Sequence, residues 1–221
     1  MWCIPKLTPE FKERMEDLID LYGKPYNPKE PVVCLDEKSK QLLADSRPPR
    51  PTASGKIAIQ DYEYVRKGTA NIFVAVEPRK GQRVTAVTKQ RKKPDYATFV
   101  EKLIAVYRHA TTIHLVQDNL NIHFLSSLIE GFGARKAKRL WKRFTCHYTP
   151  KHASWLNMAE IEIGAISKQC LDRRIASIEE LDREVRACTR KRNEKQCKIN
   201  WQFTREKAEK VFPELYSSKL I

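Results

Sequence analysis

Three acidic residues at the boundaries of apolar segments could do chemistry together. Asp36 and Asp118 each close a run of mainly apolar residues, 31–36 and 113–118. An apolar run that ends in an acid is typical of a buried strand whose last side chain emerges at the edge of a sheet. Glu160 lies at the expected start of a later helix. Carboxylates gathered at one edge repel each other unless a cation lies among them, and oxygen ligands favour Mg²⁺.

The third acid leaves two alternatives open. Asn157 with Glu160 three residues later matches a helix capping box, in which the acid only satisfies backbone amides. Glu162 is a competing candidate, because two residues of a helix separate side chains by about 200° and only one of these acids can face a metal. We favour Glu160, which shares its side of the helix with Ile163 and Ser167.

The chain is strongly basic. Its 221 residues include 42 Lys and Arg against 27 Asp and Glu, which gives a formal charge of +15 and a pI of about 9.6. A hydrophobic content of 41% is sufficient for a globular core. Excess positive charge favours a polyanionic partner, with nucleic acid as the leading candidate. A ribosomal protein, or a chain that is basic only for solubility, would show the same composition.

Two segments concentrate this charge. Residues 134–143 hold six basic side chains and Trp141, a combination that could hold phosphates while the tryptophan packs on the core or against a base. The proline-rich segment 46–55 is either a solvated loop or a contact to the DNA backbone. The predicted DNA-binding residues are Arg47, Arg50, Arg135, Lys136, Arg139 and Lys142.

The cysteines and the hydropathy pattern indicate an intracellular protein. The six cysteines form no Cys-x-x-Cys pair, which is typical of reduced thiols in the cytosol. Cys146 and His147, with His152, could supply half of a zinc site, but no second close pair completes four ligands. The sequence shows no secretory leader and no apolar run near the roughly 18 residues that span a bilayer. We therefore expect a cytoplasmic, nucleoid-associated protein with no membrane partner.

Local patterns predict one α/β domain. Thr8 and Ser177 have the features of helix caps, and Lys67-Gly68 those of a turn between strands. Helices are predicted over 9–23, 94–107 and from 177 to about 191, and strands over 31–36, 61–66, 71–76, 83–88, 113–118 and 144–149. The apolar segment 199–203 is expected to close over the core.

Four stretches together resemble the catalytic domain of a DDE-type transposase, in the bacterial insertion-sequence branch related to the mariner elements. They are residues 32–37, 61–64 with 68–71, 118–123 and 148–160, and the last two are the most specific. The resemblance implies an α/β, ribonuclease H-like (retroviral integrase-like) fold, which is a mixed sheet flanked by helices. It also implies that Asp36, Asp118 and Glu160 are the catalytic, metal-binding triad.

The resemblance further implies cleavage and strand transfer of DNA with two Mg²⁺ ions, for which Mn²⁺ can substitute. Supporting roles are expected for Asn119, His123, Lys151, His152 and Asn157. Without the resemblance, Asn119 would be interpreted as a turn former and His123 as a residue at a helix start.

The expected organisation is a helical lead-in and linker over 1–30, the catalytic domain over 31–175, and a helical extension over 176–221 packed on the same domain. Relatives carry upstream helix-turn-helix modules that this chain is expected to lack. DNA is the expected partner, with a separate polypeptide supplying end recognition and a dimer assembled on DNA. The alternatives are a catalytically inactive DNA-binding remnant of a transposase and a general structure-selective nuclease.

Overall fold

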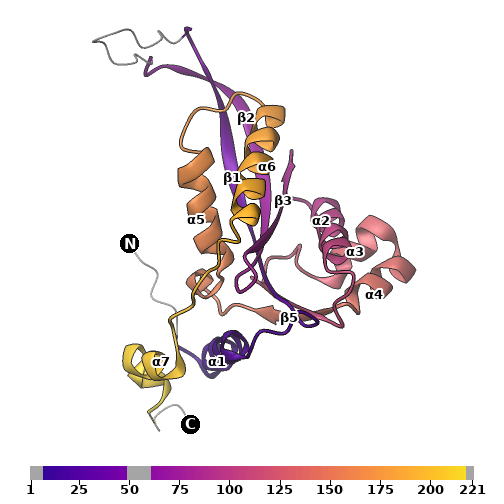
Figure 1. The fold of residues 1–221 in the computed structure, drawn as a ribbon, viewed down its shortest axis with the longest axis vertical. Coiled ribbons are helices and arrows are strands. Elements are labelled where there is room, and N and C mark those ends of the chain that lie inside the picture. Colours follow the sequence, from indigo (N-terminus) through magenta and orange to yellow (C-terminus); the bar gives the residue numbers. More distant parts are fainter. Residues whose placement is uncertain (1–6, 49–60, 218–221) are drawn as a thin grey trace.

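The computed structural model describes residues 7–48 and 61–217, which form a mixed five-stranded sheet with helices on both faces (Figure 1). The strand order is β3-β2-β1-β4-β5, with antiparallel pairs among β1, β2 and β3 and parallel pairs between β1 and β4 and between β4 and β5. The strands are β1 (Val32–Asp45), β2 (Tyr64–Glu77), β3 (Gln82–Thr88), β4 (Ile113–Gln117) and β5 (Phe144–Tyr148).

The helices lie in separate groups around this sheet. Figure 1 shows α2, α3 and α4 together on one side, α5 and α6 along β1 and β2, and α1 beside α7 at the lower end. The helices are α1 (Pro9–Gly23), α2 (Lys93–Val106), α3 (Leu125–Phe132), α4 (Ala134–Trp141), α5 (Ala159–Cys170), α6 (Ile178–Glu194) and α7 (Arg205–Val211), with 3₁₀ turns η1 (Ser154–Leu156) and η2 (Pro213–Leu215).

Alternation along β1 assigns its side chains to the two faces of the sheet. Val33 and Leu35 pack in the core that includes α2, α3 and α4, whereas Cys34 packs in the core that includes α1. Because successive side chains of a strand point to opposite faces, Glu37 is directed to the first core and Asp36 to the second. The two adjacent acids of this sequence therefore have different surroundings.

The predicted helix starts are confirmed. The Thr8 hydroxyl accepts a hydrogen bond from Phe11 N at 3.2 Å, and the Ser177 hydroxyl accepts one from Glu180 N at 3.2 Å. These caps satisfy backbone amides that have no partner within the helix. The segment 199–203 also packs as expected, with Trp201 beside Tyr22 of α1.

Two predicted strand boundaries are wrong. β1 continues past Asp36 to Asp45, and β2 runs without a turn through Lys67-Gly68. The two strands pair along this whole length, and a register shift between Leu42 and Leu43 accommodates the extra residue opposite them. Long-range pairing therefore overrides the local turn signal, and the register shift is a β-bulge. The resulting two-stranded arm extends beyond the helices (Figure 1).

No helix within residues 7–48 and 61–217 combines the length and apolar character that crossing a membrane requires. The cysteines of this part of the chain are free thiols, and Cys34 is fully buried. Arg50 lies outside the described residues, as does Cys3.

Candidate active site

The register of the parallel strands brings two of the predicted acids together. Cys34 of β1 pairs with Val116 of β4, and both side chains pack in the core that includes α1. Asp36 and Asp118 each follow two residues later, so they lie at the same level beyond the parallel pairing. Asp36 is not at a strand end, but it is at the end of the part of β1 that β4 covers.

Asn157 places the start of α5 against the same point. Its side chain is buried, its Nδ2 donates to Leu35 O at 2.8 Å, and its Oδ1 accepts from Ala159 N at 3.1 Å. Since Leu35 precedes Asp36, these two bonds bring the first turn of α5, with Glu160, beside the acid of β1. No described backbone amide bonds the Glu160 carboxylate in return, so the capping box is not formed.

The pKa of Asp36 is shifted by its burial and by the nearby charges of Glu160 and Asp118. Burial is the largest cause that raises its pKa, and the charges of Glu160, Glu37 and Asp118 raise it further, to about 7. A hydrogen bond of 2.8 Å from Glu37 N to Asp36 Oδ1 only partly offsets these effects. The negative charges of the neighbouring acids therefore all disfavour the ionised form of Asp36.

His123 links the two faces of the site. Its Nδ1 lies 2.7 Å from Asp118 Oδ1 and 3.0 Å from the Asp118 backbone oxygen, its Nε2 lies 2.8 Å from Glu37 Oε1, and the ring is fully buried against Tyr96. Burial disfavours the charged ring, but the two acids outweigh burial and raise the pKa of His123 to about 9. Burial likewise raises the pKa of Asp118, but its bond to His123 outweighs burial and holds that pKa below its usual value.

The donor set fits a hard divalent cation. Asp36, Asp118 and Glu160 offer only oxygen ligands, and a cation would relieve the repulsion that raises the pKa of Asp36. Within residues 7–48 and 61–217, no three acidic, histidine or cysteine side chains already stand as a group that could hold an ion. Glu160 is exposed, and no ion pair of the described residues involves it. Its side chain can therefore turn toward Asp36 without breaking another contact.

Glu162 is held elsewhere. Its carboxylate accepts from Arg83 Nη2 at 2.9 Å and from Arg192 Nε at 2.6 Å, and its side chain is only 1% exposed. Burial raises the pKa of Glu162, but the bonds to Arg192 and Arg83 outweigh burial and lower it. This acid connects α5 to β3 and α6, on the side of α5 away from Glu160.

A cavity of about 830 Å³ lies beside Asp118. It is lined by three of the predicted supporting residues, Asn119, Lys151 and His152, and by Arg14 of α1. Basic groups next to an acidic site can hold the phosphates of a nucleic acid strand. Asp36 and Glu160 are not among the lining residues, so the cavity reaches the site from the side of Asp118.

The predicted DNA-binding residues lie in two places. Arg135, Arg139 and Lys142 are exposed on or next to α4, whereas Lys136 pairs with Glu101 at 2.6 Å and lies over a phenylalanine ring. Arg47 is exposed at the end of the arm, 3.6 Å from Asp61. Trp141 and Arg143, in the same basic segment as α4, are structural, because Trp141 packs on the core and Arg143 donates to carbonyls after α2.

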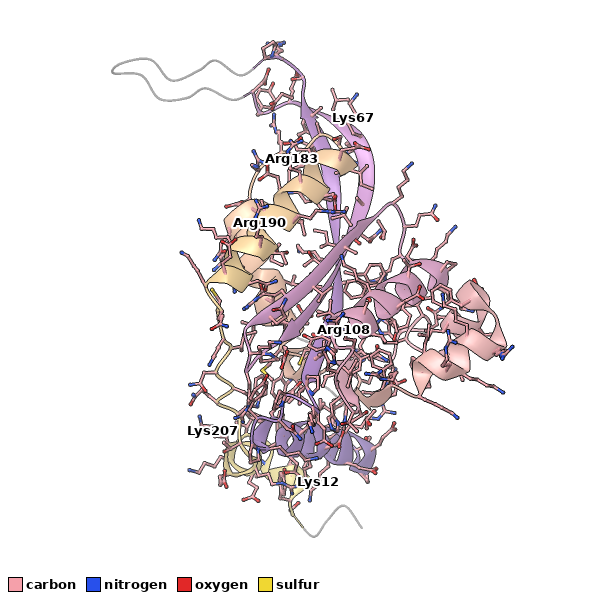
Figure 2. The ribbon with its side chains drawn as sticks, turned by 45° about the vertical axis from the view of Figure 1, so that its right-hand side comes forward. Lys12, Lys67, Arg108, Arg183, Arg190 and Lys207 are labelled. Carbon is pink, nitrogen blue, oxygen red and sulfur yellow. The ribbon has the colours of Figure 1, made fainter. Side chains whose placement is uncertain are left out.

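Positive charge extends far beyond α4. Figure 2 shows labelled basic side chains on α1 (Lys12), the arm (Lys67), α6 (Arg183, Arg190) and α7 (Lys207). It was not predicted from the sequence that Arg183 and Arg190 lie on one face of α6. Their spacing of seven residues could have indicated it.

Three residues near the acids were also missed. Glu37 binds His123, and Arg91 Nη1 lies 3.9 Å from Glu37 Oε2 and lowers the pKa of Asp118 by its charge. Arg14 lines the cavity. The alternation of side chains along β1 could have indicated that Glu37 and Asp36 lie on opposite faces of the sheet. No local sequence pattern indicates the partners of Glu37.

The raised pKa of Asp36 predicts a pH-dependent stability. Because the folded-state pKa of about 7 exceeds the ordinary value of 3.8, charging Asp36 destabilises the fold as pH rises from 4 through 7. Without divalent ions, Asp36→Asn is therefore expected to raise the free energy of unfolding by about 2 to 4 kcal/mol above pH 7, and by little at pH 4. Urea unfolding across this pH range measures the difference. The exposed Asp172→Asn is the control, and a gain that does not depend on pH would contradict the assignment.

Comparisons with known proteins identify the family and the fold of the chain. A family model described as DDE superfamily endonuclease matches residues 31–182, which is more than half of the chain. The comparison with curated protein sequences found no match. Among solved structures, a Mos1 transposase paired-end complex with left transposon end has a TM-score of 0.53 at 14% identity, over 89% of this chain and 63% of that chain.

Two Mos1 mariner paired end complexes, one with Mn and one with Mg, each have a TM-score of 0.49 at 14% identity. They cover 89% and 91% of this chain and 64% and 66% of theirs. The chain thus spans less than two thirds of the length of these relatives. It belongs to the DDE superfamily endonuclease family and has the ribonuclease H-like α/β fold of the mariner transposase.

Proposed function

We propose that this chain is the catalytic domain of a DNA transposase, which cleaves DNA phosphodiester bonds and transfers the cut strand to a new site. The observation that supports the proposal is the placement of Asp36 and Asp118 at the same level of β1 and β4, with the first turn of α5 and Glu160 held beside them, in a member of this endonuclease family. The similarity in fold to a Mos1 transposase that is bound to a transposon end supports DNA as the partner.

The three acids would hold two Mg²⁺ ions, or Mn²⁺ in their place, which activate the attacking hydroxyl and stabilise the leaving oxygen. Asp36 would gain most from a bound cation, because it feels the charges of both Asp118 and Glu160. His123 fixes one oxygen of Asp118 and so orients this carboxylate. Asn157 holds the first turn of α5 to β1 and so positions Glu160.

Residues around the cavity bind the substrate. Lys151, Arg14 and His152 surround the space beside Asp118 and would hold the phosphates that flank the cleaved bond. Asn119 donates to Thr149 O at 3.5 Å, which keeps the two loops of the cavity together. End recognition would come from a separate polypeptide, with a dimer assembled on DNA.

A nicking and strand-transfer assay tests the function. With supercoiled plasmid and Mg²⁺, the chain is expected to produce nicked DNA, and with EDTA none. An added end-binding partner is expected to direct the cuts to transposon ends. A catalytically inactive remnant would instead retain DNA in a binding assay and leave it uncut with either Mg²⁺ or Mn²⁺. That outcome would contradict the proposal.

DNA binding by the chain alone is expected to be strongly salt-dependent and to show little sequence preference. Each phosphate contact contributes about −0.9 to the slope of log affinity against log salt on duplex DNA. Exchanging Arg135, Arg139 and Lys142 together for glutamine should therefore flatten the slope by about 2 to 3. Lys136 should add less, because Glu101 already pairs with it.

The matched control removes the same charge away from α4, with Lys12 on α1 and Lys207 and Lys210 on α7 exchanged for glutamine. Fluorescence anisotropy at several salt concentrations measures both slopes. An equal effect of the two triple variants would show that net charge, and not the surface of α4, sets the affinity. A preference of about a thousandfold for one duplex over scrambled DNA would mean that the chain reads sequence itself.

A further inference from the structure

Two cysteines lie on the neighbouring helices α5 and α6, which pack beside each other along β1 and β2 (Figure 1). Cys170 is the last residue of α5, and Cys188 lies in the second half of α6. Both side chains are half-buried and pack against the same hydrophobic core. Glu160 lies at the other end of α5, so this contact is separate from the candidate active site.

The contacts between the two helices have an antiparallel register. As the residue number rises along α5 and the turn after it, the number of the partner on α6 falls. The printed pairs are Glu162 with Arg192 at 2.6 Å, Gln169 with Cys188 at 4.0 Å, and Arg173 with Glu184 at 2.8 Å. Cys170 directly follows Gln169, so this register places Cys170 at the level of Cys188.

The two thiols are within hydrogen-bonding reach of each other, and their other contacts are weak. Cys170 Sγ donates to Ile166 O at 3.3 Å, and Cys188 Sγ lies 4.0 Å from Gln169 Oε1. A disulfide needs the two sulfurs at about 2.0 Å, so both side chains must turn toward each other when it forms. Because a thiol is only a weak donor and acceptor, this turn breaks no strong hydrogen bond.

The other cysteines of residues 7–48 and 61–217 are not placed to compete. Cys34 is fully buried, and Cys146 packs on the core that includes α2, α3 and α4. Cys197 lies beyond the end of α6, and this helix continues for about 9 Å past Cys188. Within the described part of the chain, the fold therefore brings one pair of thiols together, Cys170 with Cys188.

We propose that Cys170 and Cys188 form a disulfide when the chain meets a small-molecule disulfide such as oxidised glutathione, and that this bond joins the end of α5 covalently to α6. The Cys188 thiolate attacks one sulfur of the oxidant, whose S–S bond breaks and releases one thiolate. The Cys170 sulfur then attacks Cys188 in the mixed disulfide, which releases the second thiolate. Two protein thiols are oxidised, one small-molecule disulfide is reduced to two thiols, and the protons that the cysteines lose are taken up by the leaving thiolates.

The order of the two attacks follows from the surroundings of Cys170. Burial, and then the neighbouring Cys188 thiol, raise the pKa of Cys170 to about 12, so this thiol is protonated at neutral pH. A protonated thiol reacts slowly with a reagent in solution. It suits the second step, because an intramolecular attack has a high effective concentration that compensates for a small thiolate fraction.

Peptide mapping without reductant tests the proposal. The full chain is reduced, incubated with oxidised glutathione at millimolar concentration, and its remaining thiols are blocked with N-ethylmaleimide before digestion. Trypsin releases Cys170 in residues 169–173 and Cys188 in residues 187–190. We expect a linked peptide that joins these two segments and that dithiothreitol separates. Absence of the linked peptide, or a spread of pairings over all the cysteines, would overturn the proposal.

Cys188→Ser is the decisive variant, and Cys197→Ser is its matched control. In the parent and in Cys197→Ser, oxidation should yield the linked peptide and raise the midpoint of thermal unfolding by about 5 to 10 °C, because the bond restricts the unfolded chain. Cys188→Ser should show neither effect. If it does not fold, Cys170→Ser must show the same loss.

A linked peptide without a rise of the unfolding midpoint would contradict the covalent joining of α5 to α6 in the folded chain. A rise of equal size in Cys188→Ser would assign the stabilisation to another modification and would also overturn the proposal. Neither result bears on the proposed DNA cleavage, because none of these measurements uses DNA or a divalent ion.

Discussion

Exchange of Asp36, Asp118 or Glu160 for alanine is expected to lower Mg²⁺-dependent DNA cleavage by about a thousandfold or more, which corresponds to at least ~4 kcal/mol of transition-state stabilisation. The reason is that each acid would supply oxygen ligands that no neighbouring side chain replaces. Single-turnover nicking at saturating DNA measures the loss. DNA binding should change little, because phosphate contacts come from basic residues elsewhere.

The three variants are expected to differ in folding stability. Measuring the stability of each variant shows whether a loss of cleavage is caused by unfolding. Asp36→Ala should be at least as stable as the parent at neutral pH, because repulsion among the acids is relieved. Asp118→Ala should be less stable, because it leaves the buried His123 with Glu37 as its only acidic partner. The exposed Asp172→Ala is the control for cleavage. Cleavage that survives in folded Glu160→Ala would remove Glu160 from the site.

The fold was predictable where the signal is local. The helix starts at Thr8 and Ser177 could be predicted, because a capping side chain and the backbone amide that it accepts from lie within three residues of each other. The ends of β1 and β2 were not predictable, because each strand is extended by pairing with the other across a long separation in sequence. Lys67-Gly68 has the sequence of a turn, but in the structure it lies at the β-bulge opposite Leu42 and Leu43 and β2 continues through it.

The site was predictable in part for the same reason. Two apolar segments that pair in parallel and end in acids place Asp36 and Asp118 at the same level of the sheet, and this needs only the strand pattern. The partners of His123 were not predictable, because Glu37 lies 86 residues away and its side chain faces the core opposite to that of Asp36. The burial of Arg83 was also not predictable, because an arginine in a strand is normally exposed and this one is only 2% exposed.

Removal of Glu162, in contrast to Glu160, is expected to destabilise the fold strongly. The Arg83 side chain is fully buried, and it also donates to Gly81 O at 2.6 Å and to Cys197 O. Glu162→Ala would leave this guanidinium in the interior without its counter-charge, which costs about 3–5 kcal/mol. Glu160→Ala, two residues earlier on the exposed side of α5, should lie within about 0.5 kcal/mol of the parent. Urea unfolding of both variants at neutral pH measures the difference.

The pH dependence distinguishes this ion pair from ordinary packing. Because the folded-state pKa of Glu162 lies below 4.5, its stabilising effect is complete at neutral pH and is lost as pH falls below that value. Glu162→Gln, which keeps the shape, should therefore differ most from the parent at neutral pH and converge with it in acid. A loss of equal size at both would mean that shape, not charge, holds α5 to β3 and α6. If Glu162→Ala instead abolished cleavage without destabilising the fold, while Glu160→Ala stayed active, the roles of the two acids would be exchanged.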